Sequence, residues 1–192
     1  MGRPAKFSRE KALSSAQQVF LSKGYEAASL DDLLTAMNIG RQSLYNSFGD
    51  KRHLFLEAIK LEVKEDLEEL HTFFNSHQPI KKQVLSWLSH LNQLKTSEKR
   101  KGCLILNSAM ELAGHDKEIA DIVNHSRQAQ ETLFKTAFER AKANNELPVQ
   151  FDCLHTAQYF VVAFAGMILI AKSNPKSPAL AAMAQKLAEC VA

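Results

Sequence analysis

Residues 24 to 51 constrain the fold of this 192-residue chain more strongly than any other segment. Ser29 and Asp32 have the spacing of a capping box that opens a short helix, and Gly40 supplies a turn before a second helix at residues 41–48. Two short helices joined by a tight turn are typical of a helix-turn-helix, whose second helix presents its N-terminal side chains to the major groove of DNA. The segment therefore predicts a DNA-binding unit.

Helical periodicity extends over nearly the whole chain, without a clear alternating strand pattern or hairpin signal. We predict an all-α fold in which an N-terminal three-helix unit is joined by a connecting helix to a larger C-terminal helical domain. The predicted helices cover residues 9–23, 29–37, 41–48, 50–76, 80–95, 102–113, 116–144, 152–173 and 178–190, with a break at 96–102.

Composition and charge narrow the class of protein. The chain is 45% hydrophobic and 23% charged, which is ordinary for a globular protein. Its net charge of +3 lies in the first 60 residues, where nine Lys and Arg face six Asp and Glu. No signal peptide is visible, and the most apolar stretch, residues 159–171, is too short to span a bilayer. We expect a cytoplasmic protein without membrane contact, whose three widely spaced cysteines are reduced.

The order of residues within the helix-turn-helix is more specific than the bare pattern. The segment reads Gly-Tyr-x-x-x-Ser-Leu-Asp-Asp-Leu and then Ile-Gly-x-x-x-Leu-Tyr-x-x-Phe-x-x-Lys. It resembles the N-terminal domain of the tetracycline-repressor (TetR) family of bacterial transcription regulators over roughly residues 6–66. The resemblance implies a DNA-binding domain at 6–66, a ligand-sensing and dimerisation domain at 67–192, and a homodimer on double-stranded DNA with a palindromic operator.

The predicted recognition helix carries polar side chains that can bond phosphates or base edges, namely Arg41, Gln42, Ser43, Tyr45 and Asn46. In the family, the tyrosine and the lysine of this region contact the DNA backbone, which carries over to Tyr45 and Lys51. Positions just before the tyrosine touch bases or phosphates, which implies the same for Arg41, Gln42 and Ser43.

The chain departs from the family pattern at two positions. Many members have a phosphate-contacting threonine where this chain has Ala28, and a histidine where it has Ser47. We expect Ser29 to offer its backbone N–H or hydroxyl in place of the missing threonine. At the N-terminus, Arg3 and Lys6 form either a basic arm that reaches DNA or a disordered solubilising terminus.

The last two predicted helices mix bulky and small apolar residues, which suits close packing of helices. The resemblance implies that they form a four-helix bundle with the same helices of a second copy. Packing within one chain is the alternative. The predicted interface residues are Phe160, Phe164, Ile168, Met183 and Leu187.

The resemblance also implies a small-molecule effector among the middle helices, whose binding shifts the affinity for DNA. Cys103 follows Lys-Arg-Lys-Gly and opens a helix, where cations and the helix N-terminus favour a reactive thiolate. The Gly-Cys-Leu segment resembles one in a branch of the family that includes electrophile-responsive repressors. A packing role is the alternative for Cys103 and for the other candidate sensor residues, which are Trp87, Met110, Phe138 and Tyr159.

We therefore predict a DNA-binding transcription regulator, a repressor that a small-molecule inducer releases from its operator. One alternative is a thiol-based sensor of electrophiles or oxidants that uses Cys103. An alternative from another class is a helical small-molecule-binding protein with a vestigial DNA-binding surface, against which Tyr45 and Lys51 argue. The sequence shows no nucleophile–base pair, paired carboxylates or metal-ligand spacing, so we expect no enzyme activity, cofactor or bound metal.

Overall fold

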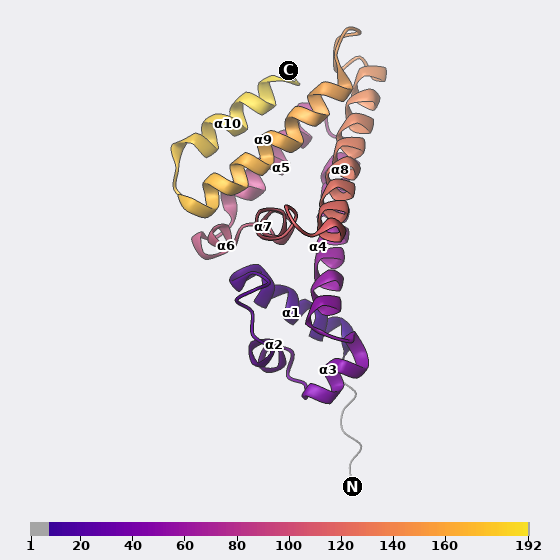
Figure 1. Cartoon of the computed structure of the whole chain (residues 1–192). Helices are drawn as coiled ribbons and strands as arrows, with labels where there is room; N and C mark the ends of the chain where they lie inside the picture. The colour runs from indigo at the N-terminus through magenta and orange to yellow at the C-terminus, as the bar shows by residue number, and fades with distance from the viewer. Residues whose placement is uncertain (1–7, 192) are drawn as a thin grey trace. The chain divides into compact units, whose positions relative to one another are not determined.

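The computed structural model describes residues 8–191, apart from the side chain of Asn92 (Figure 1). All regular secondary structure in this range is helical, which confirms the predicted all-α fold. The helices are α1 (Arg9–Lys23), α2 (Leu30–Met37), α3 (Arg41–Phe48), α4 (Lys51–Phe74), α5 (Ile80–Gln93), α6 (Thr96–Lys101), α7 (Leu104–Glu111), α8 (Lys117–Ala143), α9 (Cys153–Ser173) and α10 (Pro178–Glu189).

The predicted break at residues 96–102 is instead the short helix α6. The Glu98 carboxylate accepts the backbone N–H of Lys95 at 2.7 Å and so satisfies a donor before the first turn. Lys and Arg residues occupy the last turn of α6, where their positive charge interacts favourably with the negative end of the helix dipole. Gly102 then ends the helix with a φ of 75°. A run of basic residues here ends a helix rather than forming an open loop.

The chain forms two compact units. The first contains the described residues up to Lys64 together with Cys103–Val123, and the second contains Glu65–Gly102 and the described residues from Asn124 onward. Helix α7 and the start of α8 therefore pack with the N-terminal helices. We keep 6–66 as the proposed DNA-binding domain and 67–192 as the proposed sensing and dimerisation domain, and add that residues 103–123 pack with the first.

Helices α1 and α3 lie beside the N-terminal part of α4 in the first unit, and α2 packs on α1 (Figure 1). Local signals set their ends: Ser8 caps α1, Ser29 caps α2 with a complete capping box, and Gly24 ends α1 with a φ of 81°. The apolar faces of these helices share one core with α7 and the start of α8. Its fully buried members include Phe20, Leu33, Leu44, Leu54, Ile59 and Ile119.

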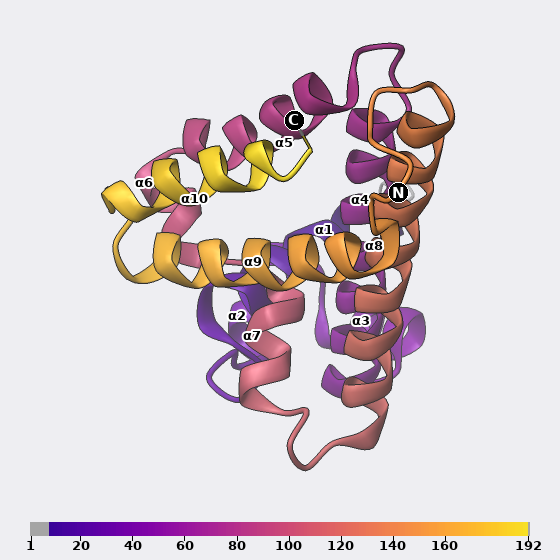
Figure 2. The same ribbon diagram turned by 90° about the horizontal axis from the view of Figure 1, so that it is seen from above.

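The second unit is built on aromatic side chains. Helix α10 packs against both α5 and α9, as Figure 2 shows. Trp87 lies at the centre, with ring centroids 4.9 Å from Phe134 and 4.2 Å from Phe164. Phe134 also packs edge-on against Phe74 and Phe160, at 4.9 Å and 5.6 Å. Edge-to-face rings at these distances stabilise a core beyond the area they bury.

Helix α9 is longer than the apolar stretch counted from the sequence. It has 21 residues, and a window of 18 residues within it has a mean hydropathy of 1.7. By length and composition alone it could cross a membrane, which corrects the expectation that no segment is long enough. A single such helix is weak evidence for a membrane span, because core helices of globular proteins have the same composition. Phe160 and Met167 of α9 are indeed buried in the core of the second unit.

Candidate nucleic-acid interface

Two apolar side chains orient the predicted recognition helix α3. Leu44 and Phe48 are 0% and 3% exposed in the core of the first unit. The turn before α3 depends on Asn38, whose φ of 53° is a left-handed conformation that asparagine tolerates well. Because the apolar face is anchored, the opposite face of α3 is directed to solvent.

The predicted DNA-contacting side chains of α3 share that outer face. Exposed positions are Arg41, Gln42, Tyr45 and Asn46, and Ser43 is half-buried. Gln42 Nε2 donates to Asn46 Oδ1 at 3.0 Å, and Arg41 Nη2 pairs with Asp31 Oδ1 at 3.3 Å. Contacts between exposed side chains contribute little stability, so these side chains can exchange them for base or phosphate contacts.

Lys51, the first residue of α4, is held beside the turn that follows α1. Its ammonium donates to the Glu26 carbonyl at 3.4 Å and lies 4.6 Å from the centroid of the Tyr25 ring. An ammonium over an aromatic face is attracted by the ring quadrupole. Burial raises the pKa of Tyr25, so its ring stays neutral under Lys51. Tyr25 and Glu26 therefore hold the Lys51 ammonium in place. In the sequence, the Gly-Tyr pair of the motif marks the turn to which they belong.

The capping box of α2 engages both the backbone and the side chain of Ser29. Its backbone N–H donates to the Asp32 carboxylate at 3.0 Å, and its Oγ accepts the Asp32 N–H at 3.1 Å. The backbone N–H that we expected to be available for DNA is therefore occupied, and the Ser29 side chain also bonds the Asp32 carboxylate. Lys23 and Ser29 hold the pKa of Asp32 at about 2, so its carboxylate is charged at neutral pH. The neighbouring Ala28 is fully buried.

Arg9, which the sequence analysis did not single out, fixes the C-terminal end of α3. Both carboxylate oxygens of Glu57 lie 2.7 Å from its Nη2, and its Nε and Nη2 donate to the Ser47 carbonyl at 3.3 Å. Its guanidinium also lies 4.6 Å from the centroid of the Phe48 ring. Arg9 therefore ties α1 and α4 to the recognition helix. Ser47 takes part through its backbone carbonyl, which accepts both bonds from Arg9.

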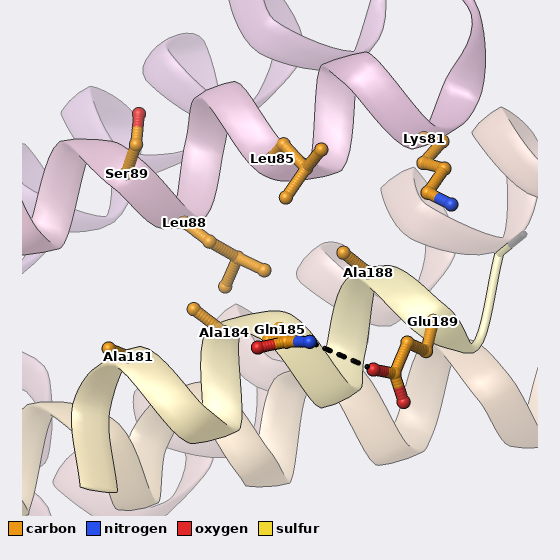
Figure 3. Close-up of a pocket in the computed structure, with 9 residues that line it drawn as sticks. All are labelled: Lys81, Leu85, Leu88, Ser89, Ala181, Ala184, Gln185, Ala188 and Glu189. Carbon is orange, nitrogen blue, oxygen red and sulfur yellow. Dashed lines mark hydrogen bonds between the residues drawn. The ribbon is translucent and has the colours of Figure 1, made fainter. Parts of the chain in front are cut away.

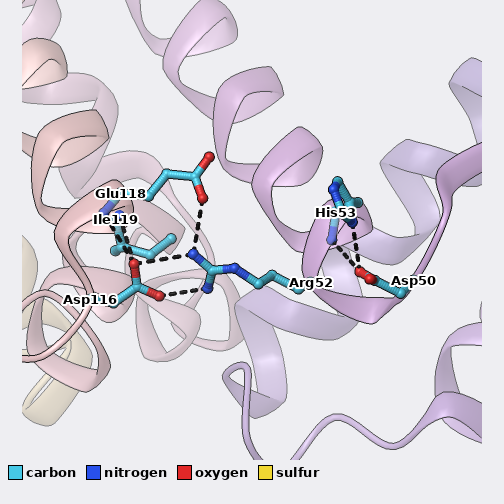
Figure 4. Close-up of polar contacts among 6 residues, drawn as sticks. All are labelled: Asp50, Arg52, His53, Asp116, Glu118 and Ile119. Carbon is cyan, nitrogen blue, oxygen red and sulfur yellow. Dashed lines mark hydrogen bonds and ion pairs between the residues drawn. The ribbon is translucent and has the colours of Figure 1, made fainter.

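A second arginine ties the start of α4 to the loop between α7 and α8 (Figure 4). Arg52 donates to Asp116 at 2.5 Å and 3.2 Å and to Glu118 at 2.9 Å. The guanidinium of Arg52 lowers the pKa of Asp116. Asp50 caps the same end of α4 by accepting the backbone N–H of His53 at 2.8 Å, which lowers the pKa of Asp50. The N-terminal end of α4, where Lys51 lies, is therefore fixed from several directions.

The predicted interface residues of α9 and α10 fall into two groups. Phe160 and Leu187 are 0% exposed within their own unit. They therefore cannot contact a second copy directly and can only pack under the residues that do. The other three are at least partly exposed, namely Phe164, Ile168 and Met183. Two further apolar side chains of α9, Val162 and Leu169, are 66% and 60% exposed. They are large apolar groups open to solvent, which is the stronger signal for an interface.

The predicted sensor residues do not gather at one place. Trp87 and Phe138 lie in the aromatic core of the second unit, and Tyr159 is 47% exposed on α9. Met110, on α7 of the first unit, is 83% exposed. Cys103 is half-buried at the N-terminus of α7. The N–H of the adjacent Leu104 donates to the buried Glu62 carboxylate at 2.8 Å.

A groove of about 520 Å³ lies between α5 and α10 of the second unit (Figure 3). Apolar side chains form its walls, and Lys81 and Glu189 lie at one end. None of the predicted sensor residues lines it. Its lining residues are Lys81, Leu85, Leu88, Ser89, Ala181, Ala184, Gln185, Ala188 and Glu189.

Comparison with known protein families covers both units. The family model described as "Bacterial regulatory proteins, tetR family" matches residues 12–58. The model described as "Tetracyclin repressor-like, C-terminal domain" matches residues 79–187, more than half of the chain.

Individual relatives span almost the full length. The chain is 33% identical over 174 residues to the uncharacterized HTH-type transcriptional regulator YezE of Bacillus subtilis, covering 90% of each chain. It is 25% identical over 179 residues to the HTH-type transcriptional repressor ComR of Escherichia coli, covering 90% of this chain and 83% of ComR.

Solved structures share the arrangement. A cysteine mutant of the TetR family regulator CifR, complexed with 26-base-pair double-strand operator DNA, aligns over 100% of both chains with a TM-score of 0.85 and 26% identity. Reduced NemR of Escherichia coli, at 18% identity and a TM-score of 0.83 over 96% of each chain, has the same fold. The apolar face of α3 is anchored in the core and its polar face is open, and the C-terminal helices match the repressor-like model. The chain therefore belongs to the TetR family of DNA-binding transcription regulators.

Proposed function

We propose that this protein represses transcription in the cytoplasm by binding a palindromic operator through α3. Tyr45 and Lys51 bond phosphates, Arg41 and Gln42 read base edges, and Ser43, Asn46 and the Ser29 hydroxyl add polar contacts. The observation that carries the proposal is the row of exposed polar side chains on a helix whose other face is anchored by Leu44 and Phe48. The names of the relatives support it, because ComR is a repressor and CifR was solved on operator DNA.

Operator recognition requires a homodimer, because one recognition helix makes too few base contacts for a useful specificity. The apolar side chains exposed on α9 and α10 supply a surface for the second copy. Val162 and Leu169 are its most exposed members, and Met183 contributes from α10 at 36% exposure. The buried Phe160 and Leu187 hold the two helices in position beneath that surface.

An effector sets the affinity for the operator. We propose a small molecule that binds the second unit and favours the state with lower affinity for DNA. The alternative is a covalent signal at Cys103, favoured by its place at the N-terminus of α7 directly after a basic run. The Glu62 carboxylate opposes this alternative, because one of its oxygens lies within 4.8 Å of the Cys103 sulfur and a negative charge nearby disfavours a thiolate.

The proposal is tested by selecting bound fragments from a random duplex library and sequencing them. We expect a palindromic motif whose two halves are recognised by two copies of α3. Enrichment of a non-palindromic motif would contradict the dimer, and absence of enrichment together with salt-insensitive binding would contradict a DNA-binding function.

Two classes of variant separate backbone contacts from base contacts. Lys51→Ala should weaken binding to every sequence alike and flatten the dependence of log K on log salt by about 0.9, as for one lost phosphate contact. Tyr45→Phe should weaken binding uniformly but leave the salt dependence as it is. Arg41→Ala or Gln42→Ala should change the selected bases, and an unchanged motif would remove both residues from base recognition.

The nature of the effector is decided by fluorescence anisotropy on the selected operator, with and without a thiol-reactive electrophile. Release from DNA in the wild type but not in Cys103→Ser would establish the thiol sensor. Binding that survives treatment in both proteins would favour a non-covalent effector, which a screen for ligand-induced thermal stabilisation of the whole protein can identify.

A further inference from the structure

Glu111, the last residue of α7, reaches the turn that follows α1. Its Oε2 accepts the backbone N–H of Tyr25 at 3.0 Å, and its Oε1 accepts the backbone N–H of Glu26 at 2.8 Å. All three residues belong to the first unit. A carboxylate that accepts two backbone N–H groups forms strong, charge-assisted hydrogen bonds and fixes the backbone that donates them.

The position of Glu111 is costly for α7 itself. A negative charge in the last turn of a helix faces the negative end of the helix dipole. The turn it binds is shaped to receive it, because Gly24 has a φ of 81° and a Cβ there would lie 2.7 Å from Glu111 Oε2. Both features indicate that the carboxylate serves the Gly24–Glu26 turn rather than its own helix.

The same turn presents Lys51. The carbonyl of Glu26 accepts the Lys51 ammonium at 3.4 Å, and the Tyr25 ring lies beneath it. Tyr25 is packed in turn against Phe55, with ring centroids 4.7 Å apart. The two residues whose backbone N–H groups bind Glu111 are therefore the two residues that contact the lysine.

We propose that Glu111 is a positioning residue for DNA binding, which acts by fixing the Gly24–Glu26 turn so that Lys51 meets a backbone phosphate. This inference rests on the proposed phosphate contact of Lys51. It makes α7, more than 50 residues further along the chain, part of the DNA-reading machinery. A displacement of α7 would reach Lys51 through this carboxylate.

The test measures affinity and its salt dependence for mixed-sequence duplex DNA, which needs no operator because phosphate contacts are independent of sequence. Glu111→Gln keeps one acceptor oxygen but turns an amide N–H₂ toward a backbone N–H. We expect about tenfold weaker binding and a salt slope flatter by about 0.9. In a Lys51→Ala background, the same substitution should change affinity by less than about twofold, because the two residues act in series.

Glu139→Gln is the matched control, since it removes the same charge from an exposed position on α8 in the second unit. It should leave affinity and salt slope unchanged. If Glu111→Gln does not fold, as judged by circular dichroism and thermal unfolding, Glu111→Asp replaces it. Aspartate keeps the charge but withdraws the oxygens by one methylene, and we expect the same losses, smaller in size.

Three outcomes would overturn the inference. Unchanged affinity and salt slope in the Glu111 variant, with both altered in Lys51→Ala, would refute the positioning role and leave the proposed function intact. Equal weakening by the Glu111 substitution with and without Lys51 would show that it acts independently of the lysine. An unchanged salt slope in Lys51→Ala would remove the phosphate contact, and with it the positioning role.

Discussion

Each unit of this protein has its own apolar core, and the two differ in the contacts that accompany it. In the first, carboxylates and arginines from distant parts of the chain close the structure, as with Glu111 at the turn after α1 and Arg52 at Asp116. In the second, rings around Trp87 and Phe134 dominate. Hydrogen bonds and ion pairs fix the direction between the groups they join, so the elements around α3 are placed by polar bonds as well as by their apolar core, whereas edge-to-face and stacked rings fill the centre of the second unit.

The difference matters for a regulator. The proposed contacts of Tyr45 and Lys51 with a DNA backbone require side chains held in register, and directional bonds supply that. If the second unit binds the effector, as we propose, its interior must instead accept different ligands. Substitutions in the first unit should therefore alter DNA binding before they unfold the protein, and substitutions in the aromatic core should do the reverse.

The largest expected effect is in the aromatic core. Phe134 is 1% exposed and packs against several rings, so Phe134→Ala should lower the free energy of unfolding by about 3–5 kcal/mol. Chemical denaturation at fixed protein concentration measures it, since a dimer's stability depends on concentration. Val149→Ala, at a side chain 83% exposed, is the control and should change stability by less than about 0.5 kcal/mol. An equally small effect at Phe134 would show that the rings do not hold the unit together.

Gly24→Ala should lower stability less than Phe134→Ala does, but it should weaken DNA binding more. Its φ of 81° with a ψ of 178° is a region that glycine alone occupies readily, so we expect a loss of about 1–3 kcal/mol. The new Cβ would also push the Glu111 carboxylate away from Tyr25 and Glu26. DNA affinity should therefore fall further than the thermal stability suggests. Gly114→Ala is the matched control in the same unit, because a Cβ there meets no atom within 4 Å and its φ is not in the positive region. Equal behaviour of the two variants would contradict the special role of the turn after α1.

A smaller effect is expected at Arg52, whose side chain is 39% exposed. Arg52→Lys keeps the charge but loses the planar fork that binds Asp116 and Glu118 together. Stability should fall by less than in Gly24→Ala, and the loss should shrink at high salt because exposed ion pairs are screened. Thermal unfolding over a range of salt concentrations measures both. A loss that does not depend on salt would mean that the hydrogen-bond geometry of the guanidinium fork, rather than the strength of the ion pairs, ties α4 to the α7–α8 loop.

The first unit also shows what the sequence could and could not reveal. Its helices were predictable because their end signals are local: Ser29 and Asp32 lie three residues apart, and Gly24 marks the end of α1. The bonds that close the unit were not, because Glu111 lies 86 residues from Tyr25 and nothing near either residue indicates the pairing. The outward face of α3 followed from helical period, since Leu44 and Phe48 are four residues apart.

In the second unit the sequence predicted helices better than roles. An aromatic residue at helical spacing is compatible with a core, a pocket or an interface, and Phe138, Phe160 and Tyr159 look alike in the sequence. Only packing separates them, since the two phenylalanines are fully buried and the tyrosine is 47% exposed. Val162, the most exposed apolar residue of α9, was missed because nothing local distinguishes an outward side chain on a helix that is apolar all round.

The smallest expected effect concerns acid, and it again separates the units. Lys23 and Ser29 lower the pKa of Asp32 from 3.8 to about 2, so its charged form stabilises the folded state. Because the folded pKa lies below the unfolded one, this stabilisation is complete above about pH 4 and is lost as the pH falls through about 2. Asp32→Asn should be slightly less stable at neutral pH and should lose less stability than the wild type between pH 4 and pH 2. Matched thermal unfolding series on both proteins measure the difference.

Asp152→Asn is the corresponding variant in the second unit, because bonds to His155 at the start of α9 lower the pKa of Asp152. If directional bonds matter more to the DNA-reading unit, Asp32→Asn should also weaken DNA binding at neutral pH, because Ser29 loses its charged partner, whereas Asp152→Asn should not.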